Sequence, residues 1–344
     1  MEYRTLGASG CAVSAFALGT MTFGNTTDHM DAFAQLDAFA EAGGTVVDTA
    51  DVYVGGTSER ITGRWLADRP AEITERIVLA TKGRFPTSGE PNAAGLSRRH
   101  LDRALTASLD RLGVDTIDLY QVHAWDPLTP LEETLSFLDD ATRSGKIRYA
   151  GLSNYHGWQV QKAVDLAEFR GLARPVTLQT GYSLLSREVE WEIGPACRST
   201  GLGMLTYSPL AAGILTGKYQ QQGTPAPGTR MADPRMGAYL RGRTQEQRTL
   251  AVLEATKKIA EDNGATMSQV ALAWLVARPA VTSVILGART LDQLVANLAT
   301  DLRLSADETA LLDAVSDPAI DFPYGGVAVQ QFARRVEGGW PVPI

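Results

Sequence analysis

The chain has 344 residues, of which 44% are hydrophobic, and its formal net charge is −7. This length suits one large α/β domain or two ordinary ones, and the acidic balance argues against nucleic acid or an anionic membrane as a partner. Two cysteines are too few for a disulfide framework, and the sequence has neither a signal peptide nor the roughly 18 consecutive apolar residues of a membrane span, so we expect a cytoplasmic protein.

The first predicted element is a hairpin over residues 2–13, with Gly7 and Gly10 in its turn. Short apolar runs and amphipathic stretches then alternate along the chain. The predicted strands cover residues 15–19, 45–48, 77–82, 117–123, 149–153, 177–182, 203–208 and 283–286. The predicted helices cover residues 31–42, 58–67, 97–112, 131–143, 156–169, 190–200, 245–263, 268–277 and 291–298.

Several predicted helices have recognisable end signals. The helix over 31–42 stops at Gly43-Gly44, and the helix over 58–67 starts at Ser58, which we expect to cap it. The helix over 97–112 carries a stripe of leucines and is followed by Gly113. These end signals support the prediction that the segments are helices, which would cover a sheet.

Eight strands that alternate with helices predict an α/β fold, a (β/α)8 TIM barrel in one domain over residues 1–344. The strands are mostly apolar, as is typical of a parallel sheet covered by helices. We expect the hairpin to plug the bottom of the barrel, and the long loop 211–243, after the seventh strand, to overhang the active rim. A doubly wound sheet is the alternative, but the turn after the first strand, LGTMTFGNTT, lacks the GxGxxG pattern of a Rossmann site.

Four chemically distinctive residues follow three successive apolar runs: Asp48, Tyr53, Lys82 and His123. The ends of barrel strands converge on one pocket. There a tyrosine can protonate a carbonyl oxygen, a lysine can lower the pKa of the phenol, an aspartate can hold the lysine, and a histidine can orient the carbonyl. This chemistry suits carbonyl reduction, and no cluster of residues at metal-ligand spacing supports a metal.

These motifs, in this order, match one family over nearly the whole chain. The matching phrases include VVDTADVYVGGTSERITGRWL, LDRLGVDTIDLYQVHAWDPLTPLEETL, SGKIRYAGLSNY, YSPLAAGILTGKY and VILGARTLDQLVANL. The sequence resembles the aldo-keto reductase superfamily, and within it the bacterial aryl-alcohol-dehydrogenase-like reductases. The resemblance implies a (β/α)8 barrel, an NADP(H) or NAD(H) cofactor without a Rossmann fold, and reversible reduction of aldehydes or ketones. It maps Asp48, rather than Asp51, onto the catalytic set.

The resemblance also implies where the cofactor binds. Ser153, Asn154 and Gln179 would hold the nicotinamide carboxamide, and Tyr207 would stack on the nicotinamide ring. Backbone N–H groups of the loop after the seventh strand would cradle the pyrophosphate. The expected cofactor-binding residues are Gly19, Thr20, Ser153, Asn154, Gln179, Tyr207, Ser208, Leu210, Gly213, Lys218, Gly287, Arg289, Gln293 and Asn297.

The segment GARTLDQLVAN, a strand end followed by a helix start, favours phosphate binding. Arg289 can pair with an adenosine 2′-phosphate, so we expect NADPH, with NADH as the alternative. Many members of the resembled family carry Glu one position before Asn297, where this chain has Ala296. That difference weakens the expected contact with the adenine or ribose.

The expected walls of the substrate pocket are residues that follow strand ends or lie in the tail: Phe23, Val54, Phe85, Trp125 and Trp340. The C-terminal segment over 321–340 would fold over the rim and take part in specificity. The Asp126-Pro127 turn is expected to shape its loop rather than to contact substrate.

The sequence therefore predicts an NADPH-dependent reductase of a small-molecule aldehyde or ketone, with Tyr53 as general acid. Two alternatives stay open. One is a cofactor-sensing regulatory subunit with slow turnover, like the potassium-channel β-subunits of the same superfamily. The other is a reductase, dehydratase or dehydrogenase of a sugar or natural-product intermediate. The oligomeric state is not predicted.

Overall fold

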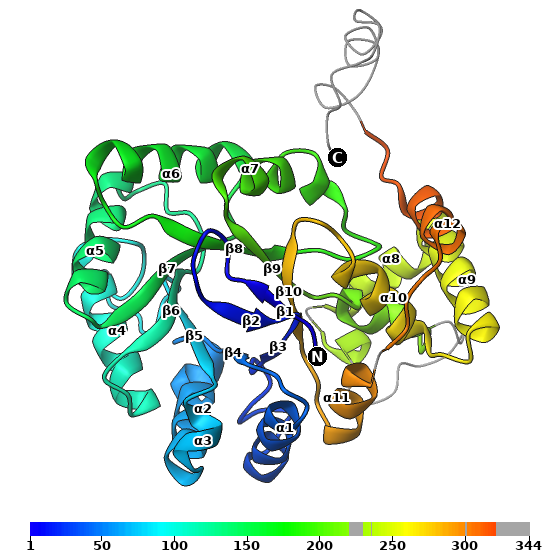
Figure 1. Ribbon diagram of the computed structural model, residues 1–344, viewed down its shortest axis with the longest axis horizontal. Helices are drawn as coiled ribbons and strands as arrows, with labels where there is room; N and C mark the ends of the chain where they lie inside the picture. Colours follow the sequence, from blue (N-terminus) through cyan, green and yellow to red (C-terminus); the bar gives the residue numbers. More distant parts are fainter. Residues whose placement is uncertain (220–229, 235, 300, 321–344) are drawn as a thin grey trace, which may run out of the picture.

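The computed structural model describes residues 1–219, 230–234, 236–299 and 301–320. Eight parallel strands form a closed barrel in the order β10-β3-β4-β5-β6-β7-β8-β9, and helices surround it (Figure 1). The predicted (β/α)8 barrel is thereby confirmed. The strands are β3 (Phe16–Gly19), β4 (Val46–Asp48), β5 (Val78–Gly83), β6 (Ile117–Val122), β7 (Ile147–Ser153), β8 (Pro175–Gly181), β9 (Gly203–Tyr207) and β10 (Val281–Leu286).

Most of the predicted helices form where expected. Helix α4 begins after Ser97, whose side chain accepts a hydrogen bond from His100 N, and ends at Gly113, which has φ 67°. The helices of the described chain are α1 (His29–Glu41), α2 (Thr57–Asp68), α3 (Ala71–Thr74), α4 (Arg98–Leu112), α5 (Leu131–Arg143), α6 (Gly157–Arg170), α7 (Ile193–Thr200), α8 (Gly237–Gln245), α9 (Gln247–Asp262), α10 (Met267–Val276), α11 (Leu291–Leu298) and α12 (Ala306–Ser316). None of these helices has the length and apolar character needed to cross a membrane.

Two local predictions, the Ser58 cap and the long loop after the seventh strand, are wrong in detail. Ser58 does not cap α2, because the helix begins at Thr57 with Gly56 as its N-cap. The helix predicted over 245–263 forms as α9, and Glu246, with extended backbone at ψ 133°, separates it from α8. The loop after the seventh strand contains short 3₁₀ helices, η3 (Ala211–Thr216) and η4 (Arg230–Ala232), together with α8. Residues 220–229 and 235 of that loop lie outside the described residues.

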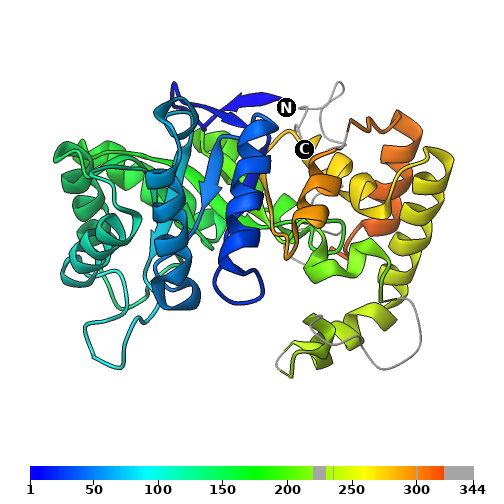
Figure 2. The same cartoon turned by 90° about the horizontal axis from the view of Figure 1, so that it is seen from below.

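The N-terminal hairpin closes one end of the barrel. Strands β1 (Tyr3–Thr5) and β2 (Ala12–Ser14) pair antiparallel, and Figure 2 shows the hairpin at the end of the barrel away from the segment that contains α8. Leu6 and Val13 are fully buried against inward-facing barrel residues such as Leu119 and Leu205. Gly7 fits this junction because it has φ 57° and because a Cβ there would lie 2.7 Å from Gly203 N. The predicted plug at the barrel bottom is therefore confirmed.

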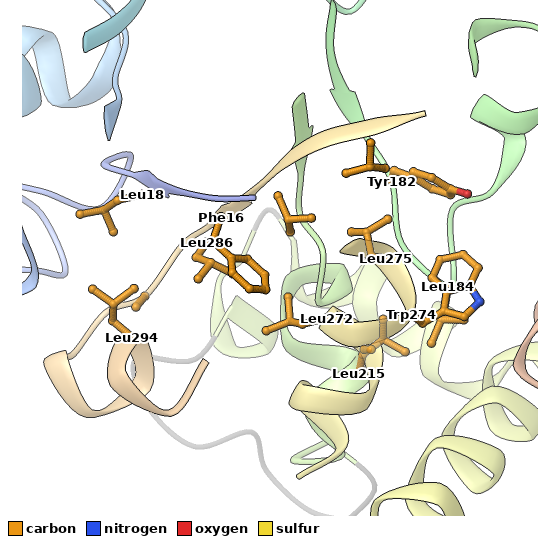
Figure 3. Packing of buried hydrophobic residues seen from close by; sticks show 14 of the residues in the cluster. Phe16, Leu18, Tyr182, Leu184, Leu215, Leu272, Trp274, Leu275, Leu286 and Leu294 are labelled. Atoms are coloured by element: carbon orange, nitrogen blue, oxygen red, sulfur yellow. The ribbon is translucent and has the colours of Figure 1, made fainter. Parts of the chain in front are cut away.

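A large hydrophobic cluster joins strands β3 and β10 to the helices outside them. Figure 3 shows Phe16, Leu18 and Leu286 of the sheet packed beside Leu294 of α11 and Leu272 of α10. The cluster also includes Leu215, in the 3₁₀ segment η3 that follows β9. Burial of each such leucine contributes about 1.5–3 kcal/mol. This packing fixes the segments after β9 and β10, which carry many of the predicted cofactor residues.

Candidate active site

A cavity of about 760 Å³ opens where the barrel strands end. This volume is within the usual range for small-molecule and cofactor sites. Tyr53 and His123 line one part of the cavity, and Lys218 and Arg289 line another. The sequence-predicted residues that line it are Gly19, Thr20, Asp48, Tyr53, Phe85, His123, Ser153, Asn154, Gln179, Tyr207, Ser208, Leu210, Gly213, Lys218, Gly287, Arg289, Gln293 and Asn297.

Lys82 lies under the cavity and connects two other residues of the predicted catalytic set. Its Nζ donates to Asp48 Oδ2 at 2.6 Å, to Thr49 O at 2.8 Å and to Tyr53 Oη at 3.3 Å. Strand pairing explains the approach, because β4 and β5 are neighbours and Asp48 ends the first of them. All three donor positions of the ammonium are therefore used.

Asp48 is buried and fully engaged. Its second oxygen, Oδ1, accepts from Gln179 Nε2 at 2.8 Å and from Gln121 Nε2 at 3.1 Å. Gln179 also donates to Gln121 Oε1 at 3.2 Å, so its amide nitrogen is directed to this network. A buried ion pair needs such extra hydrogen bonds to offset the loss of hydration. Gln179 therefore holds Asp48, in addition to the cofactor contact that the resemblance implies.

The electrostatics of Lys82 and Tyr53 are coupled. Burial disfavours the Lys82 ammonium, but Asp48 and the Tyr53 phenol raise the pKa of Lys82 above its usual value. Burial raises the pKa of Tyr53, and the Lys82 charge opposes that rise without overcoming it. The acidifying effect expected of Lys82 is thus present but smaller than the effect of burial.

His123 follows strand β6 and lies beside the phenol. Its ring centroid is 5.9 Å from that of Tyr53 and 4.7 Å from that of Phe85, both in edge-on geometry. Burial lowers the pKa of His123 to about 3, helped by the positive charges of Lys82 and Arg84. The imidazole is therefore neutral at physiological pH and can serve as a hydrogen-bonding group rather than as a cation.

Asn154 and Tyr207 form a polar pair beside the predicted catalytic residues. The Tyr207 hydroxyl donates to Asn154 Oδ1 at 2.8 Å, and Asn154 Nδ2 donates to His123 O at 2.9 Å. Asn154 has φ 54°, a left-handed conformation that asparagine tolerates better than most residues. These bonds orient the Tyr207 ring at the cavity wall, where Gly181 leaves room for it.

Three cations, Lys218, Arg230 and Arg289, line the cavity close to one another. Burial lowers the pKa of Lys218, and Arg289 and Arg230 lower it further. Burial and the charge of Arg289 also lower the pKa of Arg230. Positive charges that repel one another in a cavity are suited to an anion such as phosphate. Arg230 is absent from the predicted residues, although a basic residue in the loop after the seventh strand is a signal that could have drawn attention to it.

Backbone groups near these cations are only partly available. The N–H groups of Ala211 and Gly213 already donate to Ser208 O and Leu210 O, each at 2.9 Å. The pyrophosphate cradle expected here would therefore depend less on these two amides and more on the side chains around them.

The structure does not bring all expected pocket residues to the cavity. Phe23 is fully buried in the cluster between β3 and the outer helices, so it is a core residue. Val54 is 37% exposed on the turn after Tyr53, and it does not line the cavity. Trp125 packs edge-on against Tyr155 and Trp158 on the rim. Trp340 and the segment over 321–340 lie outside the described residues.

The loop that follows Trp125 is shaped by Asp126. Its Oδ2 accepts from Leu96 N at 2.8 Å and from Thr129 Oγ1 at 2.7 Å, and its Oδ1 accepts from Leu128 N at 3.0 Å. Asp126 does not line the cavity. The structural role expected for this turn agrees with these contacts.

A parallel barrel with titratable residues in a cavity at the strand ends has the architecture of barrel enzymes. Comparison with known proteins narrows this class. The sequence model of the Aldo/keto reductase family matches residues 15–317. The chain belongs to the aldo/keto reductase family and is an NAD(P)H-dependent oxidoreductase.

Several individual proteins are similar over most of their length. The chain is 40% identical to the uncharacterized oxidoreductase YrpG of Bacillus subtilis, over 86% of this chain and 89% of that protein. It is 37% identical to a probable voltage-gated potassium channel subunit beta of rice, Oryza sativa, over 87% and 90%. It is 31% identical to versiconal hemiacetal acetate reductase of Aspergillus parasiticus, over 91% and 96%.

Proposed function

We propose that this chain is an NADPH-dependent reductase that transfers a hydride reversibly to the carbonyl carbon of an aldehyde or ketone. The observation that carries the proposal is the position of Lys82 Nζ, which bonds both Asp48 and the Tyr53 hydroxyl below a cavity that His123 also lines. A proton donor, its charge partner and a neutral imidazole at one point suit carbonyl chemistry.

In the reductive direction, Tyr53 gives the proton of its hydroxyl to the carbonyl oxygen while the carbonyl carbon accepts the hydride. The nicotinamide, when bound, supplies that hydride. Lys82 stabilises the phenolate that Tyr53 becomes once it has given up its proton, and Asp48 keeps Lys82 in place. The neutral His123 donates a hydrogen bond that orients the carbonyl. Oxidation of an alcohol uses the same groups in reverse, with the Tyr53 phenolate as base.

The cavity suits a phosphorylated dinucleotide. Lys218, Arg230 and Arg289 supply positive charge for the pyrophosphate and an adenosine 2′-phosphate. Ser153 and Asn154 offer polar groups for a carboxamide, and the Tyr207 ring offers a flat surface beneath a nicotinamide. This charge distribution favours NADPH over NADH. The cytoplasm, where NADPH is available, is the proposed location, and a small carbonyl compound is the proposed substrate.

The similarity to the rice potassium-channel β-subunit favours one second candidate, a cofactor-sensing subunit with slow turnover. The similarity to versiconal hemiacetal acetate reductase favours a natural-product carbonyl as substrate within the main proposal. A reductase and a cofactor-sensing subunit differ in the turnover rate that the purified protein should reach, since the sensing subunit turns over slowly.

The test is NADPH oxidation with a panel of aromatic and aliphatic aldehydes, by the wild type and by Tyr53→Phe. We expect turnover by the wild type and a loss of about 10²–10⁴-fold in the variant, with NADPH affinity retained. Turnover by Tyr53→Phe at the wild-type rate would exclude Tyr53 as the acid. Tight NADPH binding without turnover on any carbonyl would favour the sensing role.

A further inference from the structure

Glu59 is a buried carboxylate that lies outside the cavity. It links the segments carrying Tyr53 and Lys82. It lies in the first turn of α2, directly after the 3₁₀ turn η1 (Tyr53–Gly56). Its side chain is 0% exposed, and its Oε1 accepts from Thr81 Oγ1 at 2.6 Å. Thr81 immediately precedes Lys82 on β5. One hydrogen bond therefore joins the helix behind Tyr53 to the strand of Lys82.

The other oxygen of Glu59 anchors the turn through Arg111 of α4, the helix next to α2 on the outside of the barrel (Figure 1). Glu59 Oε2 accepts from Arg111 Nε at 2.6 Å. Arg111 lies against Gly56, where an added Cβ would be 2.7 Å from Arg111 Cδ. The Glu59–Arg111 pair thus supports the end of the turn that begins at Tyr53.

That turn needs support because its backbone is strained. Val54 has φ 50° and is followed by Gly55 and Gly56 with φ 60° and 81°. A β-branched residue in the left-handed region costs energy and persists only where surrounding contacts impose it. If the Glu59–Arg111 contact is lost, we expect the turn to relax and the Tyr53 hydroxyl to move relative to Lys82 Nζ.

Asp51 belongs to the same buried group, and neither Glu59, Thr81, Arg111 nor Asp51 lines the cavity. Asp51 is 3% exposed, and no described side chain makes a hydrogen bond to its carboxylate oxygens. Burial and the charge of Glu59 raise the pKa of Asp51 to about 7. Arg111 is the ion-pair partner of Glu59, and Asp51 adds a second negative charge beside that pair only when it is ionised.

We infer that Glu59 is a positioning residue, which sets the approach of the Tyr53 hydroxyl to the Lys82 ammonium by joining α2 to Thr81 and to Arg111. This inference rests on the proposed function, because it assigns Glu59 an effect on the acid Tyr53. Glu59 acts by fixing the distance between the Tyr53 hydroxyl and the Lys82 ammonium, rather than by contacting substrate or cofactor.

The test compares Thr81→Val, which removes the hydroxyl, with Thr81→Ser, which keeps it at the same position. Glu59→Gln tests the carboxylate itself. We expect Thr81→Val and Glu59→Gln to lower kcat about tenfold or more, with the KM of the carbonyl and the Kd of NADPH within about twofold of the wild type. Thr81→Ser should restore most of kcat.

A second readout separates positioning from general weakening of the fold. Because the Lys82 charge lowers the pKa of Tyr53, a larger separation should raise that pKa. The pH at which kcat for alcohol oxidation is half-maximal should therefore move upward in Thr81→Val and stay unchanged in Thr81→Ser. Thermal unfolding of all variants shows that the comparison is made on folded protein, and Thr81→Val serves alone if Glu59→Gln does not fold.

Wild-type kcat and an unshifted pH profile in Thr81→Val would overturn the inference, as would equal losses in Thr81→Val and Thr81→Ser. Tyr53→Phe is measured in parallel. An inactive Tyr53→Phe with a fully active Thr81→Val rejects only the role of Glu59. An active Tyr53→Phe rejects the proposed function instead.

Discussion

Lys82 Nζ lies 2.6 Å from Asp48 Oδ2, and the two side chains are 0% and 3% exposed. Removing one member of such a pair leaves a buried charge without its partner, which costs about 3–5 kcal/mol. We expect Lys82→Met and Asp48→Asn each to lower the free energy of unfolding by about that amount. The double variant should recover most of the stability and none of the activity.

Urea denaturation followed by tryptophan fluorescence, together with NADPH oxidation, measures both quantities. If each single variant were as stable as the double variant, the charges of Lys82 and Asp48 would not stabilise each other in the folded protein.

Asp51 makes stability depend on pH. Burial and Glu59 raise its pKa from an ordinary 3.8 to about 7. Between these values the folded chain keeps a proton that the unfolded chain releases, so this carboxyl lowers stability as pH rises, by about 1.4 kcal/mol per pH unit. Asp51→Asn removes that dependence.

We expect Asp51→Asn to gain about 2.6 kcal/mol relative to the wild type when the pH is raised from about 5 to about 8. The change between the two pH values is the readout, because any cost of burying the amide is the same at both. A stability difference that does not vary with pH would show that Asp51 is ionised throughout.

Gly7 at the barrel bottom and Gly10 of the same hairpin allow a matched pair of alanine substitutions. Alanine at position 7 meets a left-handed backbone, overlaps the carbonyl oxygen of Val176 and crowds Gly203 N. At Gly10 an added Cβ has no heavy atom within 4 Å. We expect Gly7→Ala to cost about 1–3 kcal/mol and Gly10→Ala less than about 0.5 kcal/mol.

Thermal unfolding measures this difference, and NADPH affinity should be unchanged in both variants because the hairpin lies away from the cavity. Equal stability of the two variants would mean that the hairpin does not pack tightly on the barrel.

Arg230 provides a test of cofactor choice. If it contacts a phosphate of NADPH, Arg230→Gln removes a charged hydrogen bond, and we expect the Kd for NADPH to rise about tenfold or more. The Kd for NADH should change less if the contact is to the 2′-phosphate. Arg303→Gln is a suitable control, since Arg303 is 84% exposed and pairs with Glu2. Equal losses for both cofactors would assign Arg230 to the pyrophosphate.

The sequence indicates the barrel because each parallel strand is a short apolar run, and helices α5 and α11 match their predicted limits of 131–143 and 291–298. It also indicates which residues meet at the strand ends, since parallel strands place them on one rim. Asp48 and Lys82 could be paired on that basis before the distance between them was known.

Other features depend on tertiary contacts that a sequence pattern does not contain. Ser58 looks like a helix cap, yet its hydroxyl lies 2.7 Å from Thr20 Oγ1 and 3.0 Å from Thr49 Oγ1, and the helix starts before it. Phe23 follows a strand end, as a pocket residue would, but the chain turns it into the core. Arg230 lies in a loop without periodicity, so its approach to Lys218 and Arg289 follows from packing alone.

The hairpin across the N-terminal end and the cavity at the other end divide the barrel into two regions under different constraints. Residues such as Leu6 and Gly7 fill a junction that tolerates little change. Loops on the open rim can lengthen, shorten or exchange side chains without disturbing that junction. Over evolutionary time, substrate preference can therefore diverge among descendants of one ancestor while the buried ion pair of Asp48 and Lys82 stays in a fixed frame.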